Sequence, residues 1–382
     1  MELYVHIPFC RRKCRYCSFT SYAGQKSYYE EYVRLLLKEA ENRIKEADEP
    51  IRTVYIGGGT PSLLPPVLLR KLSAGLKRIY DLERLEEFTV EANPGTVSRE
   101  WVDTAAEMGI TRLSFGMQAY QDELLEVLGR IHRYEEVRYS VETARKAGIN
   151  DISLDLMFGI PAQSRTDWTE TLEAATALSP DHISAYGLIP EEGTPLYREL
   201  EECRLSLPEP EEERQMYDDA IRFLQRRGFH QYEISNFALK SHECRHNIGY
   251  WTQVPYIGLG VSSASMTGFV TDHNGISYIR TTNTDSLEEY SGMISGSSVI
   301  RTKEIIGPEE ARFETMMLGL RMNRGVDEES FFRMHRKTTE ECYGTKLHGL
   351  ERKGLLIHEN GSWKMTRRGF DIQNSILVEL ME

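Results

Sequence analysis

The chain has 382 residues, of which 40% are hydrophobic and 27% are charged. This composition excludes disordered, collagen-like and disulfide-scaffold proteins, and the length suggests two or three domains, or one large barrel with an appendage. The 59 acidic residues outnumber the 46 basic ones and give a net charge of -13, which disfavours binding to nucleic acid or to an anionic membrane surface.

The first residues lack the basic segment and apolar run of a signal peptide, and no stretch of about 18 apolar residues follows. We therefore expect a cytoplasmic protein with no integral membrane segment. Three of the six cysteines, Cys10, Cys14 and Cys17, lie close together near the start of the chain. Such crowding without a secretory signal predicts a metal or cluster site and argues against a disulfide framework.

Short apolar, β-branched runs alternate with longer segments of helical periodicity. The strand candidates are 3–7, 53–56, 88–90, 112–115, 152–156 and 182–186. The helix candidates are 29–47, 66–80, 99–108, 122–128, 134–147 and 166–177. Repeated strand–helix alternation predicts βαβ units and a parallel sheet. Six consecutive units without two distinct halves favour an α/β fold, a partial (β/α)6 barrel similar to a TIM barrel.

The regular alternation of strand and helix patterns ends at about residue 230, and the mixed short segments that follow are rich in Gly, Ser and aromatic residues. The end of the chain predicts three helices and a hairpin, a winged-helix-like pattern with its turn at 359–362. We therefore expect a barrel at 1–230, a mixed extension at 231–300 and a winged-helix-like domain at 301–382. That last segment carries 14 basic and 14 acidic residues, so it lacks the positive charge of a DNA-binding domain.

The three clustered cysteines follow the first predicted strand with the spacing CxxxCxxC. Three thiolates suit an iron–sulfur cluster in which one iron lacks a protein ligand. His6 could instead complete a zinc site with the three thiolates, and spacing alone also allows cysteines with no shared role. We expect the basic residues interleaved with the thiols to lower their pKa and to offset the charge of a cluster; they are Arg11, Arg12, Lys13 and Arg15.

Polar residues also follow the other predicted strands, where functional groups gather in βα barrels. Gly57-Gly-Gly-Thr-Pro61 follows the second strand. No Lys-Ser/Thr comes after it, so it is not a phosphate-binding P-loop; its glycines either let a ligand approach the backbone or form a tight turn. Single polar residues lie near the later strand ends, and a cap, a turn or an ion pair would explain any one of them alone: Glu91, Gln118, Arg130 and Asp155.

Taken together, these features resemble the radical S-adenosylmethionine (SAM) superfamily. The segments 4–10 (YVHIPFC), 56–64 (IGGGTPSLL), 91–96 (EANPGT), 114–119 (SFGMQA), 128–132 (LGRIH) and 155–161 (DLMFGIP) resemble its oxygen-independent coproporphyrinogen III dehydrogenase lineage. Two departures separate the chain from the dehydrogenase itself: Phe19 stands where that enzyme has a further cysteine, and the first cluster cysteine is already residue 10. Both departures, and the segment 246–251 (HNIGYW), resemble the heme chaperone branch, HemW.

The resemblance implies a role for each matching residue. Cys10, Cys14 and Cys17 would hold a [4Fe–4S] cluster whose open iron binds SAM, and Tyr4 and Tyr16 would flank it. The implied SAM contacts are the backbone of Gly58, Gly59 and Thr60 and the side chains of Glu91, Gln118, Arg130 and Asp155. A carboxylate suits ribose hydroxyls or an ammonium group, and an arginine suits a carboxylate.

For heme, His246 is the candidate iron ligand, with Tyr250 and Trp251 stacking on the porphyrin; the alternative is that these residues only pack in the core. The resemblance implies a heme-binding chaperone that transfers heme to acceptor proteins, with a small redox protein as electron donor. The alternative function is an enzyme that modifies a porphyrin such as coproporphyrinogen III through a SAM-derived radical. Whether SAM is cleaved stays open at this point.

Overall fold

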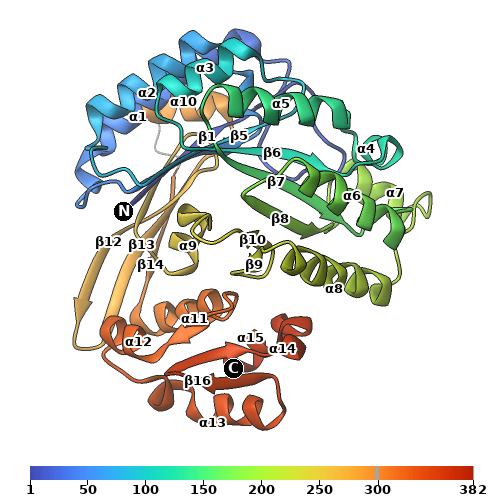
Figure 1. Cartoon of the computed structure of the whole chain (residues 1–382). Helices are drawn as coiled ribbons and strands as arrows, with labels where there is room; N and C mark the ends of the chain where they lie inside the picture. Colours follow the sequence, from blue (N-terminus) through green and yellow to red (C-terminus); the bar gives the residue numbers. More distant parts are fainter. Residues whose placement is uncertain (297–300, 382) are drawn as a thin grey trace.

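One long sheet organises the computed structural model, which describes residues 1–296 and 301–381 (Figure 1). Within these residues the sheet has twelve strands in the order β14-β13-β12-β11-β1-β4-β5-β6-β7-β8-β10-β9. Their bounds are β1 (Glu2–Ile7), β4 (Thr53–Gly58), β5 (Glu87–Ala92), β6 (Arg112–Gln118), β7 (Asp151–Phe158), β8 (His182–Gly187), β9 (His230–Gln231), β10 (Asn236–Ala238), β11 (Tyr256–Leu259), β12 (Ala264–Asp272), β13 (Gly275–Asn283) and β14 (Arg301–Ile306). A small parallel pair, β2 (Phe9–Cys10) and β3 (Tyr22–Ala23), brackets the loop with the clustered cysteines.

Six parallel strands, β1 and β4 to β8, form the barrel part of the sheet, and each corresponds to a strand expected from the sequence. The helices that connect them are α1 (Tyr29–Arg43), α2 (Pro66–Ile79), α3 (Arg99–Glu107), α4 (Asp122–Leu128), α5 (Tyr134–Lys146) and α6 (Arg165–Ala177), followed by α7 (Pro195–Glu201) and α8 (Pro210–Arg226). Most of them cover the outer face of the sheet (Figure 1). The predicted α/β partial barrel is therefore confirmed.

The two faces of the barrel strands differ in chemistry. Alternate residues such as Leu3, Val54 and Leu113 are completely buried between the strands and the outer helices, as expected from the two-residue period of a strand. The residues between them are polar and face the interior of the barrel, among them Thr89, Ser114, Ser153 and Ser184. The outer layer supplies the hydrophobic core and leaves the interior free for a polar site.

The sheet continues beyond β1 in a way that the sequence did not reveal. β11 pairs with β1 in parallel, and β12, β13 and β14 add an antiparallel ribbon. Two short helices, α9 (Arg245–Trp251) and α10 (Leu287–Ser295), lie in the same part of the chain. Residues 301–306 form β14 and so belong to this sheet, although the sequence suggested that the C-terminal domain begins at 301. The domain limits at 230 and 300 stay predictions.

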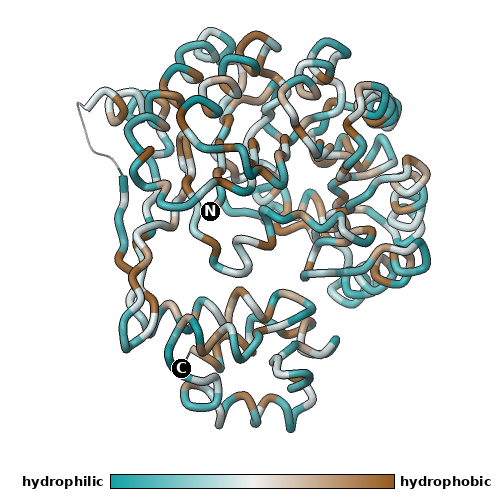
Figure 2. The backbone as a smooth tube through the Cα atoms, turned by 60° about the vertical axis from the view of Figure 1, so that its left-hand side comes forward, coloured by the Kyte–Doolittle hydropathy of each residue, from teal (hydrophilic) through white to brown (hydrophobic). Residues whose placement is uncertain are grey.

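The C-terminal residues form a lobe beneath the sheet with its own hydrophobic core (Figures 1 and 2). Its elements are α11 (Pro308–Gly319), β15 (Val326–Asp327), α12 (Glu328–His335), α13 (Thr339–Arg352), β16 (Leu356–Glu359), β17 (Ser362–Met365), α14 (Arg367–Asp371) and α15 (Gln373–Met381). Three helices thus precede the β16–β17 hairpin as expected. Asn360 and Gly361 both have positive φ in its turn, the conformation that suits Asn-Gly. The helices α14 and α15 were not expected.

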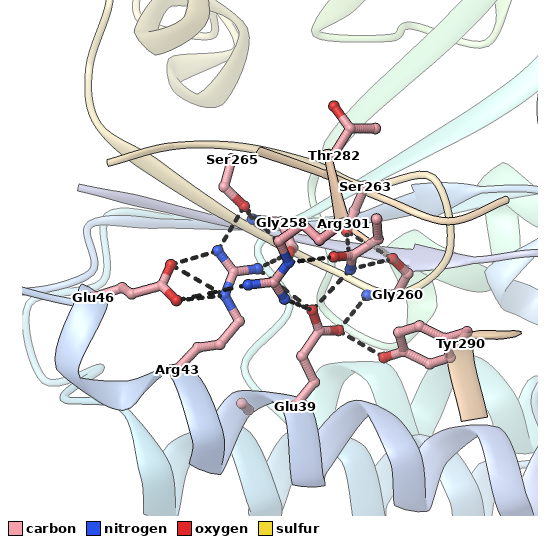
Figure 3. Close-up of polar contacts among 12 residues, drawn as sticks. Glu39, Arg43, Glu46, Gly258, Gly260, Ser263, Ser265, Thr282, Tyr290 and Arg301 are labelled. Atoms are coloured by element: carbon pink, nitrogen blue, oxygen red, sulfur yellow. Dashed lines mark hydrogen bonds and ion pairs between the residues drawn. The ribbon is translucent and has the colours of Figure 1, made fainter. Parts of the chain in front are cut away.

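A buried ionic network fastens α1 to the added strands (Figure 3). Glu39 on α1 is completely buried and accepts hydrogen bonds from Tyr290 Oη (2.6 Å), Gly260 N (2.8 Å), Asn283 Nδ2 (2.8 Å), Arg301 Nη2 (3.1 Å) and Arg43 Nη1 (3.4 Å). Arg43 also donates to the carbonyl of Gly258 at 2.6 Å. Because a buried charge is costly unless it is paired and hydrogen-bonded, this network fixes the position of the strand end at Gly260.

Candidate functional site

The carboxyl ends of the parallel strands open into a cavity of about 370 Å³ inside the barrel. Most residues implied by the sequence line it: Cys10, Cys14, Tyr16, Cys17, Gly58, Gly59, Thr60, Glu91, Gln118, Arg130 and Asp155. They come from separate strands and from the loop after β1, and the parallel arrangement brings them together. Among the residues implied for the cluster and SAM, Tyr4 is the exception, because it lines a neighbouring cavity of about 640 Å³ that shares Phe19, Gly58 and Glu91 with the first one.

The three clustered cysteines lie half-buried on the loop after β1, and none of the six cysteines forms a disulfide. Thr60 Oγ1 donates a hydrogen bond to Cys10 Sγ at 3.6 Å, and Arg130 Nη1 donates to Cys14 Sγ at 3.5 Å. Donors to sulfur stabilise thiolate character and tune iron–sulfur clusters. The loop therefore offers three sulfur ligands that share one cavity with their supporting donors.

The zinc alternative does not fit these residues. His6, which would complete such a site, is buried, and both of its ring nitrogens have partners: Nδ1 lies 3.0 Å from Tyr4 Oη and Nε2 lies 2.9 Å from the carbonyl oxygen of Thr20. Across residues 1–296 and 301–381, no three Cys, His, Asp or Glu side chains converge as ligands of one ion. A cluster distributes its ligands over several irons, so its thiolates need not converge on one point.

The expectation that neighbouring basic residues lower the thiol pKa values is wrong for Cys10 and Cys17. Burial raises the pKa of the Cys10 and Cys17 thiols, and it outweighs the basic groups nearby. The guanidinium of Arg15 pairs with Glu199, and Arg11, Arg12 and Lys13 are exposed. Lys13 does favour the thiolate of Cys17, and Arg130, which comes from a different part of the chain, lies beside Cys10 and Cys14.

Glu91 and Asp155 are half-buried carboxyl groups in the same cavity. Glu91 accepts hydrogen bonds from Tyr55 Oη at 2.8 Å and from the backbone N–H of Gly58 at 3.0 Å. Burial, together with the nearby charge of Asp155, raises the pKa of Glu91 to about 7. Burial also raises the pKa of Asp155 to about 6, although Ser114 Oγ donates to it at 3.2 Å. Two such perturbed acids in one cavity are typical of a binding or catalytic site.

The triple glycine is required by close packing at the end of β4. Gly58 has φ of +110°, and a Cβ atom there would lie 2.5 Å from the ring of His6. A Cβ atom on Gly59 would lie 2.8 Å from the carbonyl oxygen of Phe9. Only glycine allows this approach, so the strand end lies directly against the segment that precedes the first cysteine. The tight-turn interpretation and the ligand-approach interpretation are both compatible with this geometry.

Gln118 marks the end of β6 as an unusual position. It is buried and has φ of 66°, and the pairing of β6 with β7 shifts register between Gly116 and Gln118. A residue other than glycine in the left-handed region carries strain, and β-bulges of this kind redirect side chains next to active sites. The bulge explains how Gln118 reaches the cavity.

Two features of the site were missed by the sequence analysis. Asn93 joins the strands and the loop, because its Oδ1 accepts from Arg130 Nη2 at 2.7 Å while its Nδ2 donates to Thr60 Oγ1 at 2.7 Å. The polar interior of the barrel was also missed. Its signal was present as polar residues or glycine at alternate positions, with one serine in each strand: RLSFGMQ of β6, DISLDLMF of β7 and HISAYG of β8.

His246, the candidate heme ligand, lies in the core and outside the cavity. It is completely buried, and its ring nitrogens lie 2.8 Å from Thr53 Oγ1 and 3.0 Å from Tyr250 Oη. Burial lowers the pKa of His246 to about 3, so the ring is neutral. Both nitrogens are occupied, and an iron ligand needs a free one; the structure therefore disfavours His246 as the heme ligand and supports its packing role. Tyr250 and Trp251 face two different cavities.

Comparisons with known proteins agree with this geometry. Residues 4–175 match the radical SAM superfamily, and residues 306–372 match the HemN C-terminal domain. The chain is 36% identical to the heme chaperone HemW of Bacillus subtilis, and the match covers 98% of the chain and 97% of that protein. It is 31% identical to the heme chaperone HemW of Escherichia coli, and this match covers 99% of the chain and 97% of that protein. In structure it resembles coproporphyrinogen III oxidase (HemN) from Escherichia coli, a radical SAM enzyme, with a TM-score of 0.84 at 20% identity, covering 99% of this chain and 89% of that one. This last likeness shows the fold.

Proposed function

Because the chain belongs to the radical SAM superfamily and, within it, to the HemW family, we propose that it is a radical SAM heme chaperone that binds heme and transfers it to acceptor proteins. The observation that carries this proposal is the extent of the match to proteins named heme chaperones. It covers 98% of the chain at 36% identity, so it includes both the barrel and the C-terminal lobe.

The cavity in the barrel supports a cluster and SAM as resident cofactors. We propose that Cys10, Cys14 and Cys17 hold a [4Fe–4S] cluster, which when bound supplies an open iron for the amino and carboxylate groups of SAM and an electron for its cleavage. Arg130 and Thr60 donate hydrogen bonds to the sulfurs and offset their negative charge. Thr60 is buried and Arg130 is half-buried, so these donors are partly shielded from water.

The remaining cavity residues suit the polar parts of SAM. Glu91 and Asp155 present carboxyl groups to the interior of the barrel, where they would accept hydrogen bonds from the ribose hydroxyls or from the ammonium group. The backbone at Gly58, Gly59 and Thr60 approaches the cavity without intervening side chains, and Gln118 and Tyr16 close its sides. Tyr4 acts one layer away through its contact with His6 at 3.0 Å.

The partners and the compartment follow from the same proposal. We propose that a small redox protein supplies the electron and that the protein works in the cytoplasm, where cysteines stay reduced; the absence of disulfides among its six cysteines supports this. Every helix in the described residues is too short or too polar to serve as a transmembrane segment.

One experiment separates the chaperone from an enzyme that acts on coproporphyrinogen III. The protein is purified without oxygen, its cluster is reconstituted, and the sample is titrated with hemin and assayed for 5′-deoxyadenosine and for decarboxylated coproporphyrinogen. Stable heme binding that is lost to an apo-acceptor protein, without decarboxylated product, supports the chaperone. Repeated turnover of coproporphyrinogen would overturn it. A colourless, zinc-containing preparation would overturn the radical SAM assignment of the site.

A further inference from the structure

A cavity of about 530 Å³ lies outside the barrel, where the end of α9 meets α11 and α12 of the C-terminal lobe (Figure 1). Trp251 comes from α9, Thr315 and Gly319 from α11, and Phe331 and Met334 from α12. It shares no lining residue with the cavity of the clustered cysteines. Its volume lies within the range of about 300–1,000 Å³ that is usual for sites of small ligands.

Apolar and aromatic side chains form part of the wall of this cavity, beside polar residues such as Gln253 and Ser362. Trp251 and Phe331 contribute rings, and Met322 and Met334 contribute thioethers. The indole N–H of Trp251 is buried and has no acceptor among the described residues. An unpaired buried donor is costly, and a ligand carboxylate that reached it would supply the missing acceptor. The guanidinium of Arg321 lies 5.5 Å from the centre of the Trp251 ring.

The rim is positively charged, in contrast to the protein as a whole. Arg324 and Arg333 line the cavity and are exposed. Among residues 1–296 and 301–381, neither arginine forms an ion pair within 4.0 Å, although both lie near enough to Asp327 to help lower its pKa. Arg333 Nη2 donates a hydrogen bond to Ser330 Oγ at 2.9 Å. Asp327 is the acidic residue of the lining, and it caps α12 by accepting a hydrogen bond from the backbone N–H of Ser330 at 2.8 Å. The lining therefore holds two arginines without a direct ion pair and a single carboxylate, which both arginines influence from a distance.

We propose that this cavity is the heme site, with the porphyrin against Trp251 and Phe331 and its two propionates directed to Arg324 and Arg333. The inference rests on the proposed function and gives it a location. An apolar ring that carries two carboxylates matches a pocket with an aromatic wall and a pair of unpaired guanidinium groups.

The charge of the cavity beside the cluster loop argues against the alternative location there. Its arginine, Arg280, already donates to both carboxylate oxygens of Glu314, at 2.7 and 2.6 Å. Glu91 adds a second acidic group to the same lining. A propionate there would have to displace Glu314 from its partner, whereas Arg324 and Arg333 accept a carboxylate without breaking an ion pair.

The test uses the full chain with its cluster reconstituted and hemin as the ligand. The double substitution Arg324→Glu with Arg333→Glu is expected to lower hemin affinity, followed by the Soret band, about tenfold or more, because two exposed charge pairs become repulsive. Thermal unfolding should be unchanged, since both side chains are exposed. Lys337→Glu with Arg352→Glu makes the same change in net charge at exposed residues outside the cavity and should leave the affinity as it is.

Hemin dimethyl ester provides the matched ligand. Its carboxylates are esterified, so the wild-type protein should bind it more weakly than hemin. The double variant should lose this preference or reverse it, because its glutamates repel propionates but not their esters. Two results would show that the proposed location is wrong while leaving the chaperone function intact. In the first, the double variant binds hemin like the wild type. In the second, Phe19→Ser in the neighbouring cavity weakens hemin binding and the double variant does not. If the wild type does not bind hemin, the proposed function itself fails.

Discussion

The backbone N–H of Gly58 donates a hydrogen bond of 3.0 Å to the carboxylate of Glu91. This bond joins the end of β4 to the end of β5 and holds the carboxylate at the mouth of the barrel. The other carboxylate oxygen of Glu91 accepts from Tyr55 Oη at 2.8 Å. Since burial raises the pKa of Glu91 to about 7, the charge of a proposed SAM-binding group changes close to neutral pH.

We predict that SAM affinity falls as the pH is lowered through about 7. Protonation removes the negative charge that Glu91 offers to an ammonium group, and a hydrogen bond to a charged group contributes about 1.5–3 kcal/mol. Glu91→Gln should therefore bind SAM at least about tenfold more weakly above this pH and show a flatter pH profile. Equilibrium dialysis of the cluster-loaded protein measures both effects. Glu107→Gln, at an exposed helix position, is the control, and an identical pH profile in wild type and Glu91→Gln would contradict the prediction.

Substitution of any one of Cys10, Cys14 or Cys17 by serine is expected to remove most iron and sulfide from the reconstituted protein. Each thiolate would hold a different iron, and the loop offers no replacement ligand because His6 is already hydrogen-bonded on both nitrogens. Cys203→Ser alters an exposed cysteine outside the cavity and should retain the full iron content. Iron and sulfide analysis, together with visible absorbance, measures the cluster content of each variant. Loss of iron in Cys203→Ser would contradict the assignment of Cys10, Cys14 and Cys17 as the cluster ligands.

Glu39→Gln is expected to lower the free energy of unfolding by about 3–5 kcal/mol, because it leaves Arg43 and Arg301 in the interior without their shared carboxylate. Denaturant unfolding measures the loss. Glu41→Gln changes an exposed glutamate on the same helix and should stay within about 0.5 kcal/mol of the wild type. Equal stabilities of the two variants would show that the network carries little energy.

Glu2 makes stability depend on pH. Burial raises its pKa to about 9 in the folded protein from 4.5, so the folded chain keeps a proton that the unfolded chain releases. Stability from this group is therefore present at low pH and is lost as the pH rises between these two values. We expect the wild type to lose about 1 kcal/mol per pH unit relative to Glu2→Gln between about pH 6 and pH 8. Unfolding curves at several pH values test this, and Glu83→Gln at an exposed position should behave like the wild type.

His246→Ala is expected to leave the Soret spectrum of the heme complex unchanged and to lower stability by about 2 kcal/mol or more. The substitution removes the partner of Thr53 Oγ1 and of Tyr250 Oη and leaves a cavity in the core. Absorbance after hemin addition and thermal unfolding measure the two effects separately. A changed Soret band in a His246→Ala variant that keeps its full cluster content would restore His246 as a ligand candidate.

The sequence predicted the barrel strands well because each one is a local signal. The strands at 3–7 and 152–156, for example, lie inside β1 and β7, and the polar residues after them could be placed at one edge of the sheet by the rule for parallel strands. The cysteine spacing likewise depends only on a short stretch of chain. These predictions needed no knowledge of which distant segments meet.

The features that were missed depend on distant contacts. β11 lies beside β1 although about 250 residues separate them, and no local pattern encodes that pairing. The environment of His246 is set by Thr53 and Tyr55 of β4, so its burial could not be inferred from its own segment. Arg130, the cation beside Cys14, was recognised only through the family resemblance and not from its distance in sequence.

The position of β1 between β4 and β11 constrains the order in which the protein becomes complete during synthesis. β1 is made first, and β4 follows soon after, but the other edge of β1 stays unpaired until Tyr256–Leu259 leaves the ribosome. An unpaired strand edge invites wrong pairing. The second neighbour of β1 is therefore in place only when most of the chain exists, and we expect insertion of the proposed cluster to follow translation of β11.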